Sequence, residues 1–338
     1  MSGIFKANRI LLVHVSGRVG DSLLITPFIS ALRNFSKKST IDLYAHRNRV
    51  DLFYNNPNLN FIKSLSKKRA RLKGWFTFNK YDYVIIFNYF ENCDEIIRFA
   101  LRVGKKVVAF EPECMSLKKK LYISQARILD KANFIDRLFL IATRLGIDSK
   151  DRRIKFYNTP SEILTARKNL RDNKVLTKNF IIGAQLSCFS SHSYRDWPIE
   201  NFLSLFRLIL KYKKNTKFII FGTKEDKLKI NYLKDKLKGD NQCIIDFTCL
   251  SLRDTGALMS QINLYIGVDT GPSQLMSSFN IPFVCLYHAL FPSSVSGPKE
   301  HPLALLIDSK LGKDNLSSNI MLSITPKHVF NKLKNFLL

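Results

Sequence analysis

Two glycine-containing turns carry the residues of this chain that are best suited to chemistry. The later turn, Asp269 to Gln274 in the sequence I-G-V-D-T-G-P-S-Q-L, follows a short apolar run and precedes a helix-like segment. Unpaired backbone N–H groups at a helix start favour an anion, so this turn predicts a phosphate site. An ordinary tight turn with Asp269 as a helix cap is the alternative that fits this turn taken alone.

The second turn lies near the N-terminus, in the sequence S-G-R-V-G-D-S-L-L. Gly17 and Gly20 suit a loop that passes close to a ligand, and Asp21 and Ser22 stand where the next helix is expected to begin. The spacing matches neither G-x-G-x-x-G nor a P-loop, so a nucleoside triphosphate is not indicated here. Because a carboxylate repels phosphate, Asp21 is better suited to remove a proton from a hydroxyl group or to bind that hydroxyl group through a hydrogen bond.

Two further loops in the second half contain groups suited to a nucleotide diphosphate. Segment 183–198 holds several hydroxyl side chains, Ser187 among them, together with Arg195, whose planar guanidinium can pair with phosphate oxygens. A surface arginine beside a packing Trp197 is the alternative. In F-G-T-K-E-D, Glu225 can accept hydrogen bonds from ribose hydroxyls, although acidic residues open many helices.

Short apolar runs alternate with amphipathic segments along the whole chain, which predicts parallel sheets flanked by helices. The runs predict strands at 10–15, 40–45, 83–87, 106–110, 180–183, 217–221, 243–246, 264–267 and 283–287. The main helices are expected at 22–35, 131–145, 199–212, 225–237 and 252–260. Each half thus predicts its own doubly wound α/β unit. Ligands in such sheets bind at the carboxyl ends of strands, where both turns lie.

The length of 338 residues exceeds what one hydrophobic core usually supports, so two domains are expected. We expect a first domain over 1–160, a second over 161–325, and a closing amphipathic helix at 326–338 that packs back on one of them, the N-terminal domain in our assignment. No apolar run reaches the roughly 20 residues of a membrane span, and no signal-peptide pattern is found. These observations predict a cytoplasmic protein.

The chain is strongly basic, with 54 Lys and Arg against 27 Asp and Glu and a net charge of +27. Such an excess favours polyanionic partners without choosing among them, and no nucleic-acid motif accompanies it, so nucleic acid is not expected as a partner. The clusters at 67–73 and 118–120 are either solvated faces or docking sites for an anionic partner. Six scattered cysteines suggest neither a metal site nor a disulfide framework.

Three segments in this order resemble the bacterial ADP-heptose lipopolysaccharide heptosyltransferases, glycosyltransferase family 9, over nearly the whole length. They are G-R-V-G-D-S-L-L-I-T-P-F-I-S-A-L-R, Y-R-D-W-P-I-E-N-F and Y-I-G-V-D-T-G-P-S-Q-L-M-S-S-F-N-I-P-F-V-C-L-Y. The resemblance implies an α/β protein of GT-B architecture, in which two Rossmann-like doubly wound domains face each other across a cleft. It also implies that the first domain binds the acceptor and the second the nucleotide sugar.

The same resemblance assigns roles to individual residues. Asp21 is expected to be the general base, and Arg195 replaces a basic residue, often lysine in the family, that steadies the departing diphosphate. The donor residues are expected to be Ser187, Glu225, Asp269, Thr270, Gly271 and Gln274. The acceptor residues are expected to be Gly20 and Ser22 and, on the charge of their cluster, Lys118, Lys119 and Lys120. The family usually has histidine where this chain has Gln274. Glutamine cannot carry a proton or a charge, so another donor sugar, or a non-catalytic relative, remains an alternative.

The chemistry itself needs a base for the incoming hydroxyl and positive charge for the leaving diphosphate. No D-x-D sequence occurs, which argues against a metal-bridged diphosphate and leaves Arg195 to supply the countercharge. A single base acting opposite the leaving group implies inversion. We therefore expect an inverting, metal-independent glycosyltransferase without a cofactor, which moves heptose from ADP-heptose to the anionic inner core of lipopolysaccharide, Kdo-lipid A or heptosyl-Kdo-lipid A. It would contact the anionic inner membrane surface peripherally.

Overall fold

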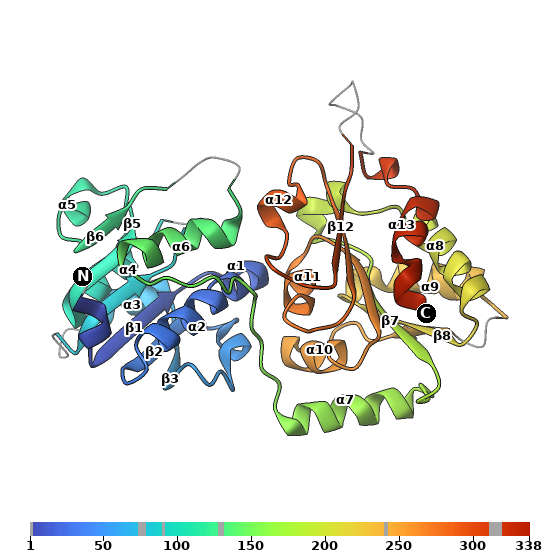
Figure 1. Cartoon of the computed structure of the whole chain (residues 1–338), viewed down its shortest axis with the longest axis horizontal. Coiled ribbons are helices and arrows are strands. Elements are labelled where there is room, and N and C mark those ends of the chain that lie inside the picture. The colour runs from blue at the N-terminus through green and yellow to red at the C-terminus, as the bar shows by residue number, and fades with distance from the viewer. Residues whose placement is uncertain (1–2, 74–78, 90–91, 128–131, 240–242, 311–319) are drawn as a thin grey trace. The chain divides into compact units, whose positions relative to one another are not determined.

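The computed structural model describes residues 3–73, 79–89, 92–127, 132–239, 243–310 and 320–338. The chain divides into two compact units, Met1–Tyr157 and Asn158–Leu338, beside the boundary expected at residue 160 (Figure 1). Each unit has its own sheet and its own helices, so each is described by itself.

The first unit alternates strands with α-helices (α) and short 3₁₀ helices (η). Its elements are η1 Gly3–Lys6, β1 Arg9–His14, α1 Val19–Leu24, α2 Thr26–Phe35, β2 Thr40–His46, η2 Val50–Phe53, β3 Phe61–Leu65, α3 Lys67–Leu72, β4 Tyr81–Ile86, α4 Asp94–Val103, β5 Gly104–Phe110, α5 Met115–Lys118, β6 Ile123–Gln125 and α6 Phe134–Arg144.

The second unit repeats the same alternation. Its elements are α7 Pro160–Asp172, β7 Phe180–Gln185, η3 Ser190–Arg195, α8 Ile199–Tyr212, β8 Thr216–Phe221, η4 Lys224–Asp226, α9 Lys227–Lys236, β9 Ile244–Asp246, α10 Leu252–Met259, β10 Leu264–Val268, α11 Gly271–Met276, β11 Phe283–Tyr287, α12 Ser293–Ser296, β12 Ala304–Asp308, η5 Ile320–Ser323, α13 Pro326–Leu333 and η6 Lys334–Leu337.

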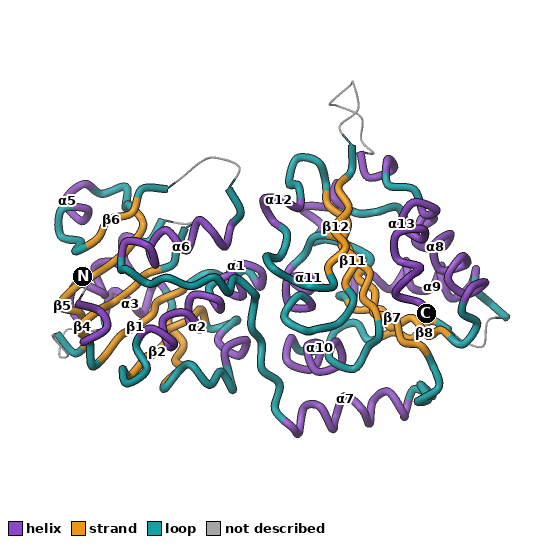
Figure 2. Tube along the Cα trace, in the orientation of Figure 1, coloured by secondary structure: helices purple, strands orange, loops and turns teal. Residues whose placement is uncertain are grey.

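Both sheets are parallel, six-stranded and connected in the same way (Figure 2). The first has the order β3-β2-β1-β4-β5-β6, and the second, read from β9, has the order β9-β8-β7-β10-β11-β12. In each sheet the order of the strands reverses between the first and fourth strands of the unit, β1 and β4 or β7 and β10. Open parallel sheets bind ligands outside the carboxyl ends of the strands at this switch point. The predicted doubly wound α/β units are therefore confirmed, and the sites to inspect follow β1, β4, β7 and β10.

The central strands are almost wholly buried because helices cover them. All five residues of β10 and of β11 are buried, and β1 is exposed only at its first residue. In the second core Phe206 of α8 stacks on Phe218 of β8, with ring centroids 3.9 Å apart, and Trp197 meets Phe202 edge to face. Continuous apolar strands of this kind are what a doubly covered parallel sheet requires.

The closing helix α13 packs against α8 inside the second unit (Figure 1). Its buried side chains, Val329 and Leu333, join the core of the second unit. Trp197 Nε1 also donates a hydrogen bond to the carbonyl of Ile324, 2.9 Å away, just before the helix. The assignment of this helix to the N-terminal domain was wrong, because its apolar face is buried within its own unit.

Candidate functional site

Asp21 lies in the first turn of α1, just after β1. The Ser16 hydroxyl donates a hydrogen bond to Asp21 Oδ2 at 3.1 Å and accepts one from the backbone N–H of Arg18. The helix begins at Val19, before the expected start at residue 22, and ends before a second helix, α2, that carries Pro27 in its first turn. The half-buried carboxylate is therefore held in place beside the carboxyl end of β1.

The ends of the two switch-point strands of the first unit are tied together by Asn88. Its side chain accepts a hydrogen bond from the backbone N–H of Val15 and donates one to the carbonyl of the same residue, both at 3.1 Å. Asp21 lines a small cavity at this point, with His14, Ser16, Asn88 and Tyr89 among the other lining residues. The Asp21 carboxylate thus lies at a small recess at the switch point of the first sheet, where polar groups meet the apolar side chains of Leu24, Phe87 and Leu138.

The residues predicted to bind the acceptor lie in two separate places, around α1 and at the end of α5. Ser22 is fully buried and its hydroxyl donates to the carbonyl of Arg18, one turn earlier in the chain, so it stabilises α1 and is not presented to a ligand. Gly20 lies within α1. Lys118 is engaged by Glu111, with Nζ and Oε1 2.8 Å apart, whereas residues 119–120 are exposed lysines.

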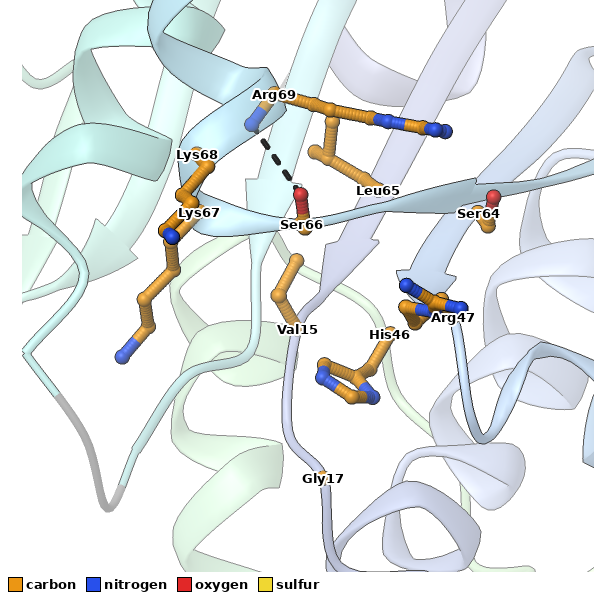
Figure 3. A pocket seen from close by; sticks show the side chains of 10 residues that line it. All are labelled: Val15, Gly17, His46, Arg47, Ser64, Leu65, Ser66, Lys67, Lys68 and Arg69. Atoms are coloured by element: carbon orange, nitrogen blue, oxygen red, sulfur yellow. Dashed lines mark hydrogen bonds between the residues drawn. The ribbon is translucent and has the colours of Figure 1, made fainter.

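A larger cavity of about 680 Å³ lies beside Gly17, at the carboxyl ends of β1, β2 and β3 (Figure 3). Its lining comes from three segments: Val15 and Gly17; His46 and Arg47; and Ser64, Leu65, Ser66, Lys67, Lys68 and Arg69. Four of these ten residues are arginine or lysine and none is acidic, so the cavity suits an anion. We call it the basic cavity.

The basic cavity contains residues that the sequence left undecided between a solvated face and a docking site. Lys67 begins α3, which is capped by Ser66 through a hydrogen bond from the backbone N–H of Arg69. Arg47 and Lys68 are exposed and form no ion pair within the described parts of the chain. His46, the last residue of β2, and Arg47, which follows it, carry no sequence signal that predicts their place beside Gly17.

In the second unit Arg195 and Asp269 form an ion pair across the switch point. Arg195 Nη1 lies 3.1 Å from Asp269 Oδ2, and their side chains are only 18% and 10% exposed. Burial raises the pKa of Asp269, while the positive charge of Arg195 opposes that rise. The Arg195 guanidinium also lies over the ring of Phe291, 5.1 Å from its centroid. Asp269, predicted as a donor ligand, therefore holds the predicted cation.

The loop after β7 is fixed by Asp196 and Lys229. Asp196 Oδ1 accepts a hydrogen bond from the backbone N–H of Cys188 at 2.6 Å, and its Oδ2 lies 2.8 Å from Lys229 Nζ. Lys229, on α9, also donates to Ser187 Oγ at 2.6 Å, and Cys188 Sγ contacts the Asp269 carbonyl oxygen at 3.6 Å. The structure thus links Ser187, Arg195 and Asp269 in one network. It adds Asp196 and Lys229, which no sequence pattern pointed to.

The remaining predicted donor residues lie around the same strand ends. Thr270 caps α11 by accepting a hydrogen bond from the backbone N–H of Ser273, and Gly271 is the first residue of that helix. Gln274 is buried and its Nε2 donates to the carbonyl of Ser296 at 2.6 Å, while its Oε1 has no hydrogen-bond partner among the described residues. Glu225 is exposed in η4, after β8.

The described part of the chain lacks two features. It contains no group of three or more His, Cys, Asp or Glu side chains arranged to hold a metal ion. None of its helices combines the length and the apolar character that crossing a bilayer demands.

The chain matches the model of a known protein family and one characterised relative. The family model described as glycosyltransferase family 9 (heptosyltransferase) matches residues 135–304. The chain is 20% identical, over 280 residues, to lipopolysaccharide heptosyltransferase 3 of Escherichia coli, covering 80% of this chain and 81% of that protein.

Two solved structures share the fold over nearly their whole length. A family 9 glycosyltransferase from Veillonella parvula matches with a TM-score of 0.80 and 18% identity, covering 98% of this chain and 97% of that one. ADP-heptose lipopolysaccharide heptosyltransferase II of E. coli matches with a TM-score of 0.76 and 17% identity, covering 97% and 98%. These matches confirm the predicted GT-B class of fold. Because the family model spans half of the chain, the chain belongs to glycosyltransferase family 9, the heptosyltransferases, and is a glycosyltransferase.

Proposed function

We propose that this protein moves heptose from ADP-heptose to the anionic inner core of lipopolysaccharide, Kdo-lipid A or heptosyl-Kdo-lipid A, with inversion and without a metal ion. The observation that carries the proposal is the basic cavity, with four cationic side chains and no acidic one. It adjoins Gly17, in the same turn as Asp21, so an acceptor bound there by its carboxylate or phosphate groups would lie near a candidate base. The match to a lipopolysaccharide heptosyltransferase supports this class of acceptor.

In the proposed reaction Asp21 removes the proton of the acceptor hydroxyl. The hydroxyl oxygen then forms a bond to the anomeric carbon as the bond from that carbon to the diphosphate breaks, which inverts the configuration. Ser16 supports this role because its hydrogen bond to Oδ2 orients the carboxylate. Kdo and phosphate groups carry the negative charge that Arg47 and Lys68 would meet.

Arg195 is the proposed countercharge for the departing diphosphate. Its guanidinium is oriented by Asp269 and by the ring of Phe291, so little rearrangement is needed when charge develops on the leaving group. Ser187, Glu225, Thr270, Gly271 and Gln274 complete the proposed donor site. ADP-heptose is the donor named for the E. coli heptosyltransferase II, whose fold this chain shares. We further propose that the +27 protein works on the cytoplasmic side, in peripheral contact with the anionic inner membrane surface.

The test is a turnover assay with ADP-heptose and purified Kdo-lipid A acceptors, in the presence of a chelator. Asp21→Asn should lower kcat by about 10²–10⁴-fold with little change in ADP affinity, because only the base is removed. Asp148→Asn, a change of an exposed carboxylate in the same unit, is the matched control. Wild-type turnover by Asp21→Asn would remove Asp21 from the mechanism, and turnover only with another nucleotide sugar would refute the donor.

A further inference from the structure

His14, the last residue of β1, is buried without regular hydrogen bonds. It is 3% exposed, and neither ring nitrogen makes a hydrogen bond of regular geometry with any described residue. Burial lowers its pKa to about 4; the backbone of Phe87 opposes the shift and the charge of His46 adds to it. The ring is therefore neutral at pH 7 and offers one N–H donor and one nitrogen acceptor. The backbone of Phe87 acts on one of these positions, and because buried polar groups are normally satisfied, the other calls for a ligand.

The ring lines the same small cavity as Asp21. The cavity volume is about 10 Å³, room for about one water-sized group. The other polar lining groups have partners: the Ser16 hydroxyl donates to Asp21, and the Asn88 amide is bound to Val15. His14 is thus a lining side chain with one hydrogen-bonding position still to fill, because the backbone of Phe87 acts on the other. A hydroxyl group, which both donates and accepts, matches it in size and in chemistry.

We propose that His14 binds the acceptor, by holding one hydroxyl group of the acceptor sugar in the cavity beside the Asp21 carboxylate. This inference rests on the proposed function and adds to it a residue that positions the acceptor. The proton of the reacting hydroxyl still goes to Asp21 and none is transferred to His14, which remains neutral. The same chemistry would also suit a trapped water molecule, and the experiment separates these two sources.

The test compares His14→Phe and His14→Gln with wild type, by acceptor and donor kinetics and by thermal unfolding. His14→Phe keeps a planar ring without nitrogens and should lower kcat/KM for the acceptor by about 10-fold, with the KM for the donor unchanged. His14→Gln should recover part of this loss, because its amide donates and accepts.

His301→Phe is the matched control. His301 is also buried, but its Nε2 bonds the carbonyl of Phe279 at 2.8 Å and its Nδ1 accepts from the backbone N–H of Leu303 at 3.2 Å. The control should lower Tm and leave acceptor kinetics unchanged. A changed Tm with unchanged acceptor kcat/KM in His14→Phe would mean that the cavity holds only water and would overturn the assignment. Absence of turnover by wild type would instead refute the proposed function, and this inference with it.

Discussion

Removal of Arg195 should separate two effects, because this side chain has two partners: Asp269 in the protein and the proposed diphosphate. Arg195→Ala leaves the buried carboxylate of Asp269 without its cation. Breaking a buried ion pair in this way costs about 3–5 kcal/mol. The loss of stability has an upper limit, because the carboxyl group becomes neutral when it takes up a proton.

That upper limit depends on pH. Protonating a carboxyl group of ordinary pKa 3.8 costs about 1.36 kcal/mol for each pH unit above that value, or about 4.4 kcal/mol at pH 7 and about 1.6 kcal/mol at pH 5. A charged Asp269 without Arg195 has a pKa raised further above its unfolded value, so the variant regains stability as pH falls. We expect a loss of about 3 kcal/mol at pH 7, which lowers Tm by roughly 6–12 °C, and a loss below about 1.6 kcal/mol at pH 5.

The double variant Arg195→Ala/Asp269→Asn distinguishes the two partners. Removing the stranded charge should restore most of the stability at pH 7, whereas ADP affinity should stay about 10–150-fold below wild type in both variants, the equivalent of about 1.5–3 kcal/mol for a charge-assisted hydrogen bond. Thermal unfolding at pH 5 and pH 7 and calorimetric titration with ADP measure these quantities. Recovery of ADP affinity in the double variant, or an equal loss of Tm at both pH values, would refute the reasoning.

The two remaining predictions concern ion pairs and surface charge. Glu162→Gln should lower the free energy of unfolding by about 1–2 kcal/mol at pH 7, because Arg253 bonds both carboxylate oxygens, at 2.7 and 2.6 Å. Burial would raise the pKa of Glu162, but Arg253 lowers it to about 2. The wild type should therefore lose its extra stability over Glu162→Gln as the pH falls from 4.5 towards 2. A stability difference that does not change with pH would contradict this role of the ion pair. The double variant Arg47→Ala/Lys68→Ala should raise the KM for the acceptor by about 5–25-fold at low salt and by less at 0.5 M NaCl, with an unchanged KM for the donor. The same change at residues 119–120, both lysine, is the control, and equal effects of the two double variants would exclude a specific role for the basic cavity.

Eight of the nine strands that the sequence predicted lie inside the two sheets, and the ninth, β9, lies at an edge. Runs such as Ile10 to Val15 and the stretch of β10 are continuous and apolar, because a parallel strand inside a doubly wound sheet has no face in water. Strand β3, at the edge of the first sheet, alternates exposed and partly buried residues, and β12 at the edge of the second is mostly half-buried. Strand β3 leaves no continuous apolar run, whereas β12 lies in the apolar run 303–307, which was missed as a strand.

The candidate site divides in a similar way. Asp21, Arg195 and Asp269 could be chosen from the sequence because each lies in the segment that joins a predicted strand to the next predicted helix. Arg195 and Asp269 are 74 residues apart, however, and nothing local predicts that they pair. His14 was read as part of an apolar run, since its burial is the same as that of its neighbours. Its missing hydrogen bonds and its place beside Asp21 are properties of the assembled sheet alone.

The link between the loops after β7 and β10 has a consequence for the design of chimaeras. Arg195 and Cys188, from the first loop, both contact Asp269 at the start of the second. A chimaera that takes only one of these loops from a relative with another donor would leave the buried Asp269 carboxylate unpaired or the Arg195 guanidinium misplaced. Segments 186–197 and 269–274 should therefore be exchanged together, as one cassette, on strands that are left unchanged.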